Sequence, residues 1–362
     1  MSLESRPSAL VLGLALFSMF FGSGNLIYPL SLGVEASSNQ APAFFGFALT
    51  AVLLPLLGVA AMVLYDGKSS RFFDLLGSPL GFLFASLLLL IWIPLGSGPR
   101  CIALSYASLE TNLDIGPAWL YGLVYSGLIA LLVSGRRRAL HLLGSFLTPL
   151  LLLCLATIFL SALYAPVEIP LEVEESHGWP LFFNAMVEGY NTQDLIAAFF
   201  FSASVMTILR RCEEGASLQD DLLLLLRAGV IAALILAVVY GALLYSASVH
   251  SAQLLALPRE KMLAQLAKIS LGPQMGLSAA IAVFLACLTT SVALVVVFTD
   301  YLMESFSLGR KSALIITLVS CYLMALTGLS GITAITSPLL QFCYPALLLL
   351  IVYGCMRKAL AK

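Results

Sequence analysis

Length, composition and charge already restrict the class of this protein. Of its 362 residues, 60% are hydrophobic and only 10% are charged, and the mean hydropathy is +1.02. A soluble globular chain carries roughly 25% charged residues, so this composition predicts an all-α membrane protein with many spans. The formal net charge is −1 and no basic run is interleaved with aromatics, which excludes a nucleic-acid-binding surface as the organising feature.

Ten apolar stretches of the chain are long enough to cross about 30 Å of hydrocarbon. No soluble domain fits between them, so we expect residues 1–362 to form a single transmembrane domain. The first stretch lacks a small-residue cleavage pattern and is expected to be a retained helix rather than a signal peptide. The expected spans run approximately from Ala9 to Gly33, Ala43 to Tyr65, Leu80 to Leu109, Pro117 to Ser134, Leu140 to Tyr164, Leu181 to Leu209, Leu222 to Ser248, Gly276 to Met303, Ser312 to Thr327 and Ile332 to Cys355.

Basic residues are concentrated in alternate loops between these stretches. The loops in question contain Lys68, Arg71, Arg136, Arg137, Arg138, Arg210, Arg211, Arg310 and Lys311, and the C-terminal end contains Arg357, Lys358 and Lys362. By the positive-inside rule, both termini are expected in the cytoplasm. One outer connection, from Val249 to Met275, is also basic, and we expect it to form an external lid with a short helical stretch after Pro258.

The first span is interrupted near its middle by Phe21-Gly22-Ser23-Gly24-Asn25. Glycine tolerates backbone angles that a helix interior does not use, and an asparagine amide finds no partner in lipid. Irregular backbone at bilayer depth survives only where protein buries it or where it lines a cavity. The sequence therefore predicts a broken helix at a ligand or ion site. The alternative is that Gly22 and Gly24 only allow close helix packing.

The sixth span has a comparable interruption. Ten spans with both ends inside divide into two sets of five, and since five is odd, the second set enters from the opposite side. We therefore expect an inverted repeat with halves at approximately residues 9–164 and 181–355. The first span of the second half contains the polar run from Glu188 to Asp194 between apolar segments. Breaks at corresponding positions of the two halves indicate a binding site at the repeat interface.

A broken helix offers backbone groups of both polarities. The N–H groups of Ser23, Gly24 and Asn25 could hold a carboxylate. Carbonyls near Val187 to Gly189 could take an ammonium group, so the two breaks together suit a zwitterion. The substrate-binding candidates in the sixth span are Glu188, Gly189, Tyr190, Asn191 and Thr192.

The eighth span supplies hydroxyl groups, because Cys287, Thr290 and Ser291 fall on one helix face. Together with carbonyls that end the first half of the first helix, around Ser18 to Phe21, they would give about five neutral oxygen ligands, which suit a hard cation such as sodium. The alternative is that the hydroxyls bond back to carbonyls of the preceding turn, as is common in apolar helices.

Several of these phrases resemble the bacterial branched-chain amino-acid:cation symporter family. The resemblance covers most of the chain and rests on Phe21 to Pro29, Gly98-Pro99-Arg100, Gly189-Tyr190 with Asp194, and Ala286-Cys287-Leu288 followed by Thr290. It implies sodium-coupled uptake of leucine, isoleucine and valine across the bacterial inner membrane. It also implies the LeuT-type fold of the broader amino-acid transporter superfamily, a five-plus-five inverted repeat with discontinuous first and sixth helices.

In that fold a sodium site commonly joins carbonyls of the first helix to hydroxyls of the eighth. The corresponding residues here are Ser18, Phe21, Cys287, Thr290 and Ser291. No cofactor is expected besides the coupling ion. Family members usually continue for two more helices, so the sequence gives no expectation for an oligomeric state.

Arg100 is the one arginine expected well inside a span. A charge near the bilayer centre costs at least roughly 2.5 kcal/mol, so Arg100 should face the protein interior and have a partner. We expect that partner to be Glu188, Asp194 or the substrate carboxylate; alternatively, Arg100 binds carbonyls freed by a kink at Pro99.

Other functions fit the sequence less well. Glu188 and Asp194 could carry protons, so a proton-coupled or broader-specificity neutral amino-acid transporter is the main alternative. A channel or a transport-like receptor would need a continuous polar pore or a signalling domain, and the sequence contains neither. An enzyme is not expected, because no histidine-containing catalytic motif or paired metal ligands lie within the spans.

Overall fold

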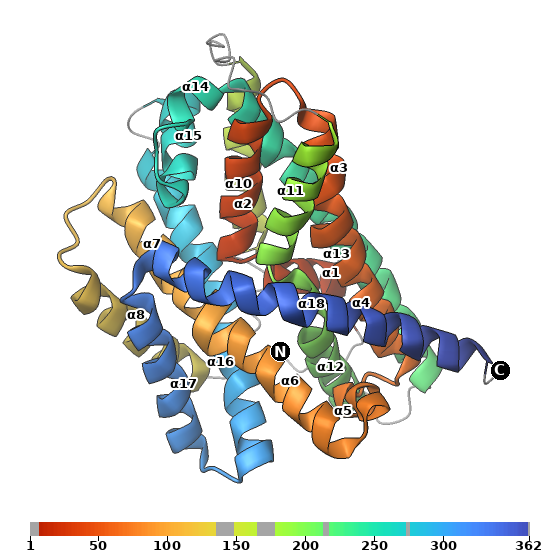
Figure 1. Cartoon of the computed structure of the whole chain (residues 1–362). Helices are drawn as coiled ribbons and strands as arrows, with labels where there is room; N and C mark the ends of the chain where they lie inside the picture. The colour runs from red at the N-terminus through yellow and green to blue at the C-terminus, as the bar shows by residue number, and fades with distance from the viewer. Residues whose placement is uncertain (1–6, 135–147, 165–177, 213–216, 273–275, 361–362) are drawn as a thin grey trace.

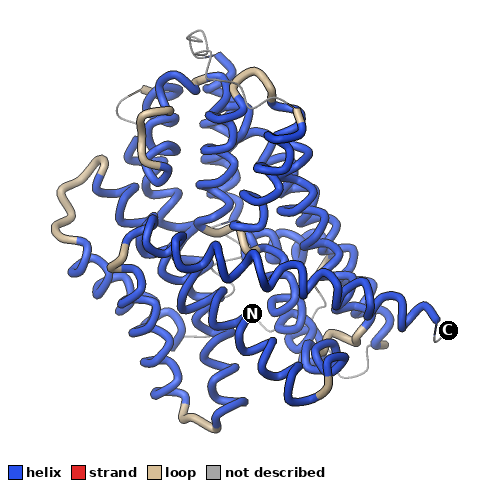
Figure 2. The backbone as a smooth tube through the Cα atoms, in the orientation of Figure 1, coloured by secondary structure: helices blue, strands red, loops and turns tan. Residues whose placement is uncertain are grey.

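The computed structural model describes residues 7–134, 148–164, 178–212, 217–272 and 276–360. Every regular element in these residues is helical (Figure 2). In chain order the elements are α1 (Ala9–Phe20), α2 (Ser23–Ala36), α3 (Gln40–Ala48), η1 (Leu49–Leu53), α4 (Leu54–Leu64), α5 (Ser69–Phe73), η2 (Asp74–Leu76), α6 (Ser78–Trp92), η3 (Ile93–Ser97), α7 (Gly98–Glu110), α8 (Ala118–Ser134), α10 (Thr148–Tyr164), α11 (Trp179–Asn191), α12 (Asp194–Cys212), α13 (Leu218–Val249), α14 (Ser251–Leu254), η5 (Arg259–Lys261), α15 (Met262–Leu271), α16 (Gly276–Phe306), α17 (Arg310–Ala325) and α18 (Gly328–Leu360).

Helices lie in all ten of the expected spans, but not all of them qualify as membrane-crossing by length and composition. Among the described residues, 5 continuous helical stretches qualify, and α1 with α2 makes a sixth if this pair, bent by 72°, is counted as one span. Two shorter apolar helices, Ala118–Ser134 and Pro149–Ala162, occupy the fourth and fifth expected spans. Ten crossings therefore stay a prediction. Residues 140–147 of the fifth span, and the basic residues 136–138, lie outside the described residues.

The first helix break follows from its local sequence. α1 ends at Phe20 and α2 starts at Ser23, so the break consists of Phe21 and Gly22. Gly22 has an extended backbone, and its N–H donates to the side-chain oxygen of Asn25 at 3.1 Å. This bond caps the second helix from within its own first turn. Asn25 thus helps to start the helix that it was expected to interrupt.

The second break lies between α11 and α12, at Thr192 and Gln193. Gln193 has a left-handed backbone with φ of 69°, a conformation that costs a non-glycine residue roughly 1 kcal/mol. The break lies within the expected polar run from Glu188 to Asp194, but α11 continues past the carbonyls near Val187 to Gly189 and ends at Asn191. Gly189 stays helical: a side chain there would collide with Thr50 of η1, so this glycine serves close packing.

Each broken helix is flanked by a long helix from the other half of the chain (Figure 1). α13 packs against both α1 and α2, while the continuous stretch from α3 through η1 to α4 packs against both α11 and α12. The two breaks are therefore held at the same depth in the bundle by uninterrupted neighbours.

The third span brings polar residues to the level of the breaks. It runs from α6 through the π-helical η3 to α7, with prolines at the start of both later segments. A π-helical turn widens the helix locally and is frequent at functional sites. α7 packs along α16, and η3 lies against α17 and α18. Ser97 and Arg100 consequently face the centre of the bundle.

The long connection after α13 covers one end of the bundle. α14 and α15 lie beside α2 and α10, at the top of Figure 1. α15 packs against α10 and α16, and η5 packs against α2 and α7. Lys268 donates to the Thr111 carbonyl at 3.4 Å, and the Lys261 ammonium lies 3.9 Å from the Glu110 carboxylate. Basic residues of this connection therefore bond to the adjacent end of α7.

Candidate functional site

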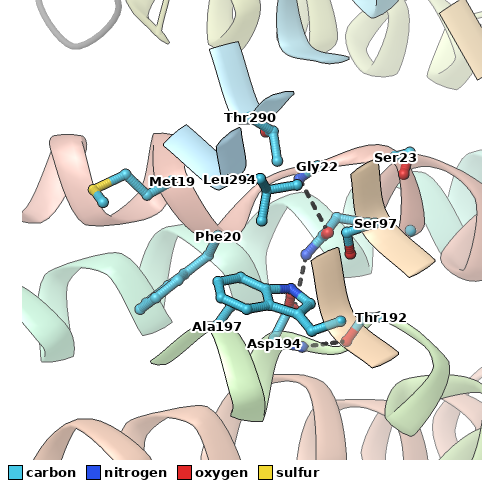
Figure 3. A pocket seen from close by; sticks show the side chains of 13 residues that line it. Met19, Phe20, Gly22, Ser23, Ser97, Thr192, Asp194, Ala197, Thr290 and Leu294 are labelled. Atoms are coloured by element: carbon cyan, nitrogen blue, oxygen red, sulfur yellow. Dashed lines mark hydrogen bonds between the residues drawn. The ribbon is translucent and has the colours of Figure 1, made fainter. Parts of the chain in front are cut away.

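A small cavity lies where the two helix breaks meet (Figure 3). The space open to the centre of a water-sized sphere is about 10 Å³, which is room for about one water molecule. An amino acid does not fit in this conformation, so the surrounding helices must move apart to admit one. The lining residues are Met19, Phe20, Gly22, Ser23, Gly24, Asn25, Trp92, Ser97, Thr192, Asp194, Ala197, Thr290 and Leu294.

Asn25 connects the two breaks directly. Its amide nitrogen donates to Asp194 Oδ2 at 2.8 Å and also to the hydroxyl of Tyr240. The Tyr240 hydroxyl in turn donates to the same Asp194 oxygen at 2.8 Å. All three side chains are almost completely buried. A closed polar network therefore joins α2, α12 and α13 at the centre of an otherwise apolar bundle.

Two glycines allow the breaks to come this close together. A Cβ added at Gly24 would lie 3.1 Å from the Cα of Thr192, which is in the second break. A Cβ added at Gly22 would lie 3.0 Å from the Thr290 methyl group. The close-packing role that was left open for these glycines is therefore real, and it occurs at the break itself.

Part of the predicted sodium set comes together. The Thr290 hydroxyl donates to the carbonyl of Phe21 at 3.1 Å, across the gap between α16 and the first break. Its neighbour Thr289 bonds back to Ala286 at 2.7 Å, which is the alternative considered for this stretch. Ser291 instead contacts the Tyr125 hydroxyl at 3.2 Å. Ser18 and Cys287, the other two members, are buried.

Arg100 connects the third span to both broken helices. Its guanidinium donates to the Asn191 carbonyl at 2.6 Å and to the Tyr28 hydroxyl at 2.9 Å, and it also bonds the Ser97 hydroxyl at 3.0 Å. Within the described residues it forms no ion pair with Glu188 or Asp194, so these two expected partners were wrong. Arg100 instead binds a carbonyl freed by a helix end, although the carbonyl belongs to α11 and not to its own helix.

Most of the other candidates in the sixth span lie away from the cavity. Glu188 pairs with Arg259 of the outer connection at 3.0 Å and accepts a hydrogen bond from Asn191 at 3.3 Å. Tyr190 packs against Tyr344, with ring centroids 4.9 Å apart. Only Thr192 of the five residues predicted here lines the cavity, whereas Ser23, Gly24 and Asn25 of the first break all do.

Sequence reasoning missed three polar residues of the site. Tyr240 bonds both breaks, and Ser97 donates to the Gln193 side chain at 2.7 Å. A tyrosine inside a long apolar helix could have been noticed, because a buried tyrosine hydroxyl usually needs a partner. Ser97 and Gln193 carry no such signal, since their contacts depend on how the third and sixth spans pack.

The acidic, histidine and cysteine side chains of the described residues do not form any group of three or more that could hold a metal ion. The groups that meet at Thr290 are neutral oxygens, its own hydroxyl and the Phe21 carbonyl. This chemistry suits a weakly held alkali cation better than a transition metal.

Comparison with known sequences gives matches along nearly the whole chain. The family described as "Branched-chain amino acid transport protein" matches residues 5–362. A branched-chain amino acid permease, BrnQ of Bacillus subtilis, is 31% identical over 358 residues, which cover 96% of this chain and 80% of that protein. A branched-chain amino acid transport system 2 carrier protein of Pseudomonas aeruginosa is 31% identical over 353 residues, covering 94% and 79%.

Two solved structures have a similar fold. MhsT in complex with L-phenylalanine superposes with a TM-score of 0.53 at 17% identity, covering 91% of this chain and 81% of that one. The inward-facing conformation of Mhp1 gives a TM-score of 0.58 at 14% identity, covering 95% and 75%. At such identities the similarity concerns the fold alone.

Proposed function

Because this chain belongs to the family of branched-chain amino acid transport proteins, we propose that it is a sodium-coupled symporter that imports leucine, isoleucine and valine. Its relatives are named permeases and carrier proteins, and not enzymes. The observation that carries the proposal is the meeting of two helix breaks at one buried cavity, joined by the bond from Asn25 to Asp194.

The proposed topology has ten spans, with both termini in the cytoplasm of the bacterial inner membrane and two inverted repeats. The packing of neighbouring spans supports it: the span that follows each broken helix packs along the broken helix of the other half, α3 to α4 along α11 and α12, and α13 along α1 and α2. An inverted repeat produces such reciprocal pairing, because the two halves share one interface. The similarity in fold to MhsT and Mhp1 is consistent with this arrangement.

The substrate is proposed to bind between the breaks, with its carboxylate at the start of α2. The first N–H groups of a helix are unpaired and carry partial positive charge. Gly22 already bonds Asn25, which leaves the N–H groups of Ser23 and Gly24 for the ligand. Met19, Phe20, Trp92 and Leu294 supply apolar surface for an aliphatic side chain.

Sodium is proposed to bind beside this site, between α16 and the first break. The Thr290 hydroxyl and the Phe21 carbonyl are already in contact there. A cation between them would fix the angle of the broken helix and so favour substrate binding. Rocking of the bundle would then expose both ligands to the cytoplasm while the outer connection covers the other end.

Uptake into proteoliposomes tests the proposal. Labelled leucine is supplied with a sodium, lithium or proton gradient and challenged with each unlabelled amino acid. We expect saturable uptake that requires sodium and is inhibited by leucine, isoleucine and valine. Uptake that never saturates would contradict a carrier, uptake driven only by protons would contradict sodium coupling, and competition only by polar or aromatic amino acids would contradict the substrate class.

A further inference from the structure

Asp194 is a buried acidic residue that forms no ion pair within the described residues. It is the first residue of α12, it lines the cavity between the breaks, and its exposed fraction is 2%. No lysine, arginine or histidine of the described chain forms an ion pair with it. Hydrogen bonds and the start of α12 stabilise the carboxylate in part, but an ion in low-dielectric surroundings still costs several kcal/mol without a counter-ion.

The side chains that bond to the Asp194 carboxylate are neutral. Asn25 and Tyr240 both donate to Oδ2. Thr192, the adjacent polar residue, donates its hydroxyl proton to the Gly189 carbonyl at 2.8 Å. None of these three groups carries a positive charge. Arg100 does not supply that charge by direct contact, because its three hydrogen bonds go to neutral oxygens.

A second group at the same cavity also lacks a partner. The hydroxyl of Ser23 is buried, with an exposed fraction of 1%, and makes no hydrogen bond. It lies at the start of α2, where the substrate carboxylate is proposed to bind. A ligand that donates hydrogen bonds and carries a positive charge beside its carboxylate would satisfy both Ser23 and Asp194.

The chemistry around Asp194 favours an ammonium group over a metal ion. A metal cation needs several acceptor oxygens, whereas the groups that face this carboxylate, the Asn25 amide nitrogen and the Tyr240 hydroxyl, are donors to it. An ammonium group needs acceptors for only three N–H bonds and gains most from one carboxylate.

We propose that Asp194 is the counter-ion of the substrate's α-ammonium group. The assignment rests on the proposed function and replaces the expected role of carbonyls near Val187 to Gly189, which lie inside α11. It makes Asp194 a determinant of substrate class. An α-hydroxy acid with the leucine side chain fills the same space but leaves the carboxylate without a counter-ion, so the site rejects it.

Binding to the purified protein tests the assignment. Labelled leucine is titrated onto the wild type, Asp194→Asn and Asp194→Glu, with unlabelled 2-hydroxy-4-methylpentanoate as competitor. Asp300→Asn, about three turns from Thr290 on α16, is the matched control for loss of a carboxylate. We expect Asp194→Asn to weaken the binding of leucine at least about 50-fold and to weaken the binding of the hydroxy acid much less. The ratio of the two affinities, which favours leucine in the wild type, should therefore become smaller. Asp194→Glu and Asp300→Asn should keep the preference.

The outcomes separate this assignment from the proposed function. Wild-type protein that binds leucine and the hydroxy acid equally overturns the assignment, whether or not the Asn variant folds. Asp194→Asn that binds leucine like the wild type also overturns it. If that variant binds leucine normally but loses proton-driven uptake into proteoliposomes, Asp194 is a proton carrier instead. Wild-type protein that binds no branched-chain amino acid overturns the proposed function itself, and the assignment with it.

Discussion

The two helix breaks meet at one cavity but are built in different ways. The first consists of Phe21 and Gly22, contains no charged residue, and is capped by Asn25 three residues further on. The second contains a left-handed Gln193, is followed by the buried charge of Asp194, and has its last free carbonyl held by Arg100 from another span. The first break is thus closed largely by its own sequence, and the second by tertiary contacts.

This difference divides the site into a locally encoded part and a part that exists only in the assembled bundle. Substitutions at the second break should therefore remove several interactions at once. Substitutions at the first should act through steric fit or through a single hydrogen bond. The following variants test that division.

Arg100 should give the largest effect. Arg100→Ala removes the hydrogen bonds to the Asn191 carbonyl and to the Tyr28 and Ser97 hydroxyls, and we expect leucine uptake per inserted protein to fall at least about 100-fold. Arg100→Lys should keep part of the activity, because a lysine supplies the charge but not the planar set of donors. Arg227→Ala, at an exposed position of α13, is the control. Unchanged uptake by Arg100→Ala would remove this residue from the mechanism.

Gly24 should give the next largest effect, and for a steric reason. The first methyl group of a side chain there would lie 3.1 Å from the Thr192 backbone, so Gly24→Val must push the breaks apart. Such overpacking costs about 1–3 kcal/mol, and we expect uptake to fall about tenfold to 100-fold. Gly127→Val in α8 is the matched control, because nothing lies within 4 Å of a Cβ at that position. Equal uptake by the two variants would show that the close approach of the breaks is not required.

The same division explains what could be predicted from the sequence. Hydrophobic runs located a helix in every expected span, and the glycines with Asn25 located the first break, because both signals are local. The second break lies within the polar run that predicted it, but its free carbonyls were placed too early, near Gly189, because a glycine is equally typical of close helix packing. Nothing in the local sequence distinguishes these two uses of glycine.

For the site, the sequence identified which polar residues take part more reliably than it identified the residues that they bond to. Thr290 and the Phe21 carbonyl were predicted to share a sodium ion, and the structure brings the two groups into contact, while the sodium site itself stays a prediction. Arg100 was expected to find a carboxylate, and it binds neutral oxygens on two other helices. The role of Tyr240 depends on α13 packing along both halves of the first span, which periodicity does not specify.

Thr290 should give a smaller and more selective effect. Thr290→Ala removes one proposed sodium ligand and one hydrogen bond to Phe21, so we expect the half-saturating sodium concentration to rise about fivefold, with little change in the maximal rate. Thr289→Ala is the matched control on the same helix, because its hydroxyl bonds only to its own helix, at Ala286. Equal sodium dependence of the two variants would argue against a sodium site at the first break.

Loss of the ion pair between Arg259 and Glu188 should have the smallest effect on uptake, although Glu188 also bonds Asn191, the last residue before the second break. Glu188 bonds Asn191, whose carbonyl binds Arg100, so the pair links the outer connection to the site. Arg259 is 46% exposed, and partly exposed pairs contribute about 0.2–1 kcal/mol. We therefore expect Arg259→Gln to change the initial uptake rate no more than about fivefold, and less at high ionic strength because salt screens exposed charges.

The double variant Arg259→Gln with Glu188→Gln distinguishes the pair from the general charge of the outer connection. If the pair acts as a unit, the double variant should resemble each single one, because the second substitution removes nothing that remains. Lys261→Gln, which loses a 3.9 Å contact to an exposed carboxylate, should have no measurable effect. If Lys261→Gln matches Arg259→Gln, then net charge at the outer face acts on uptake, and the second break is not coupled to the outer connection through Glu188.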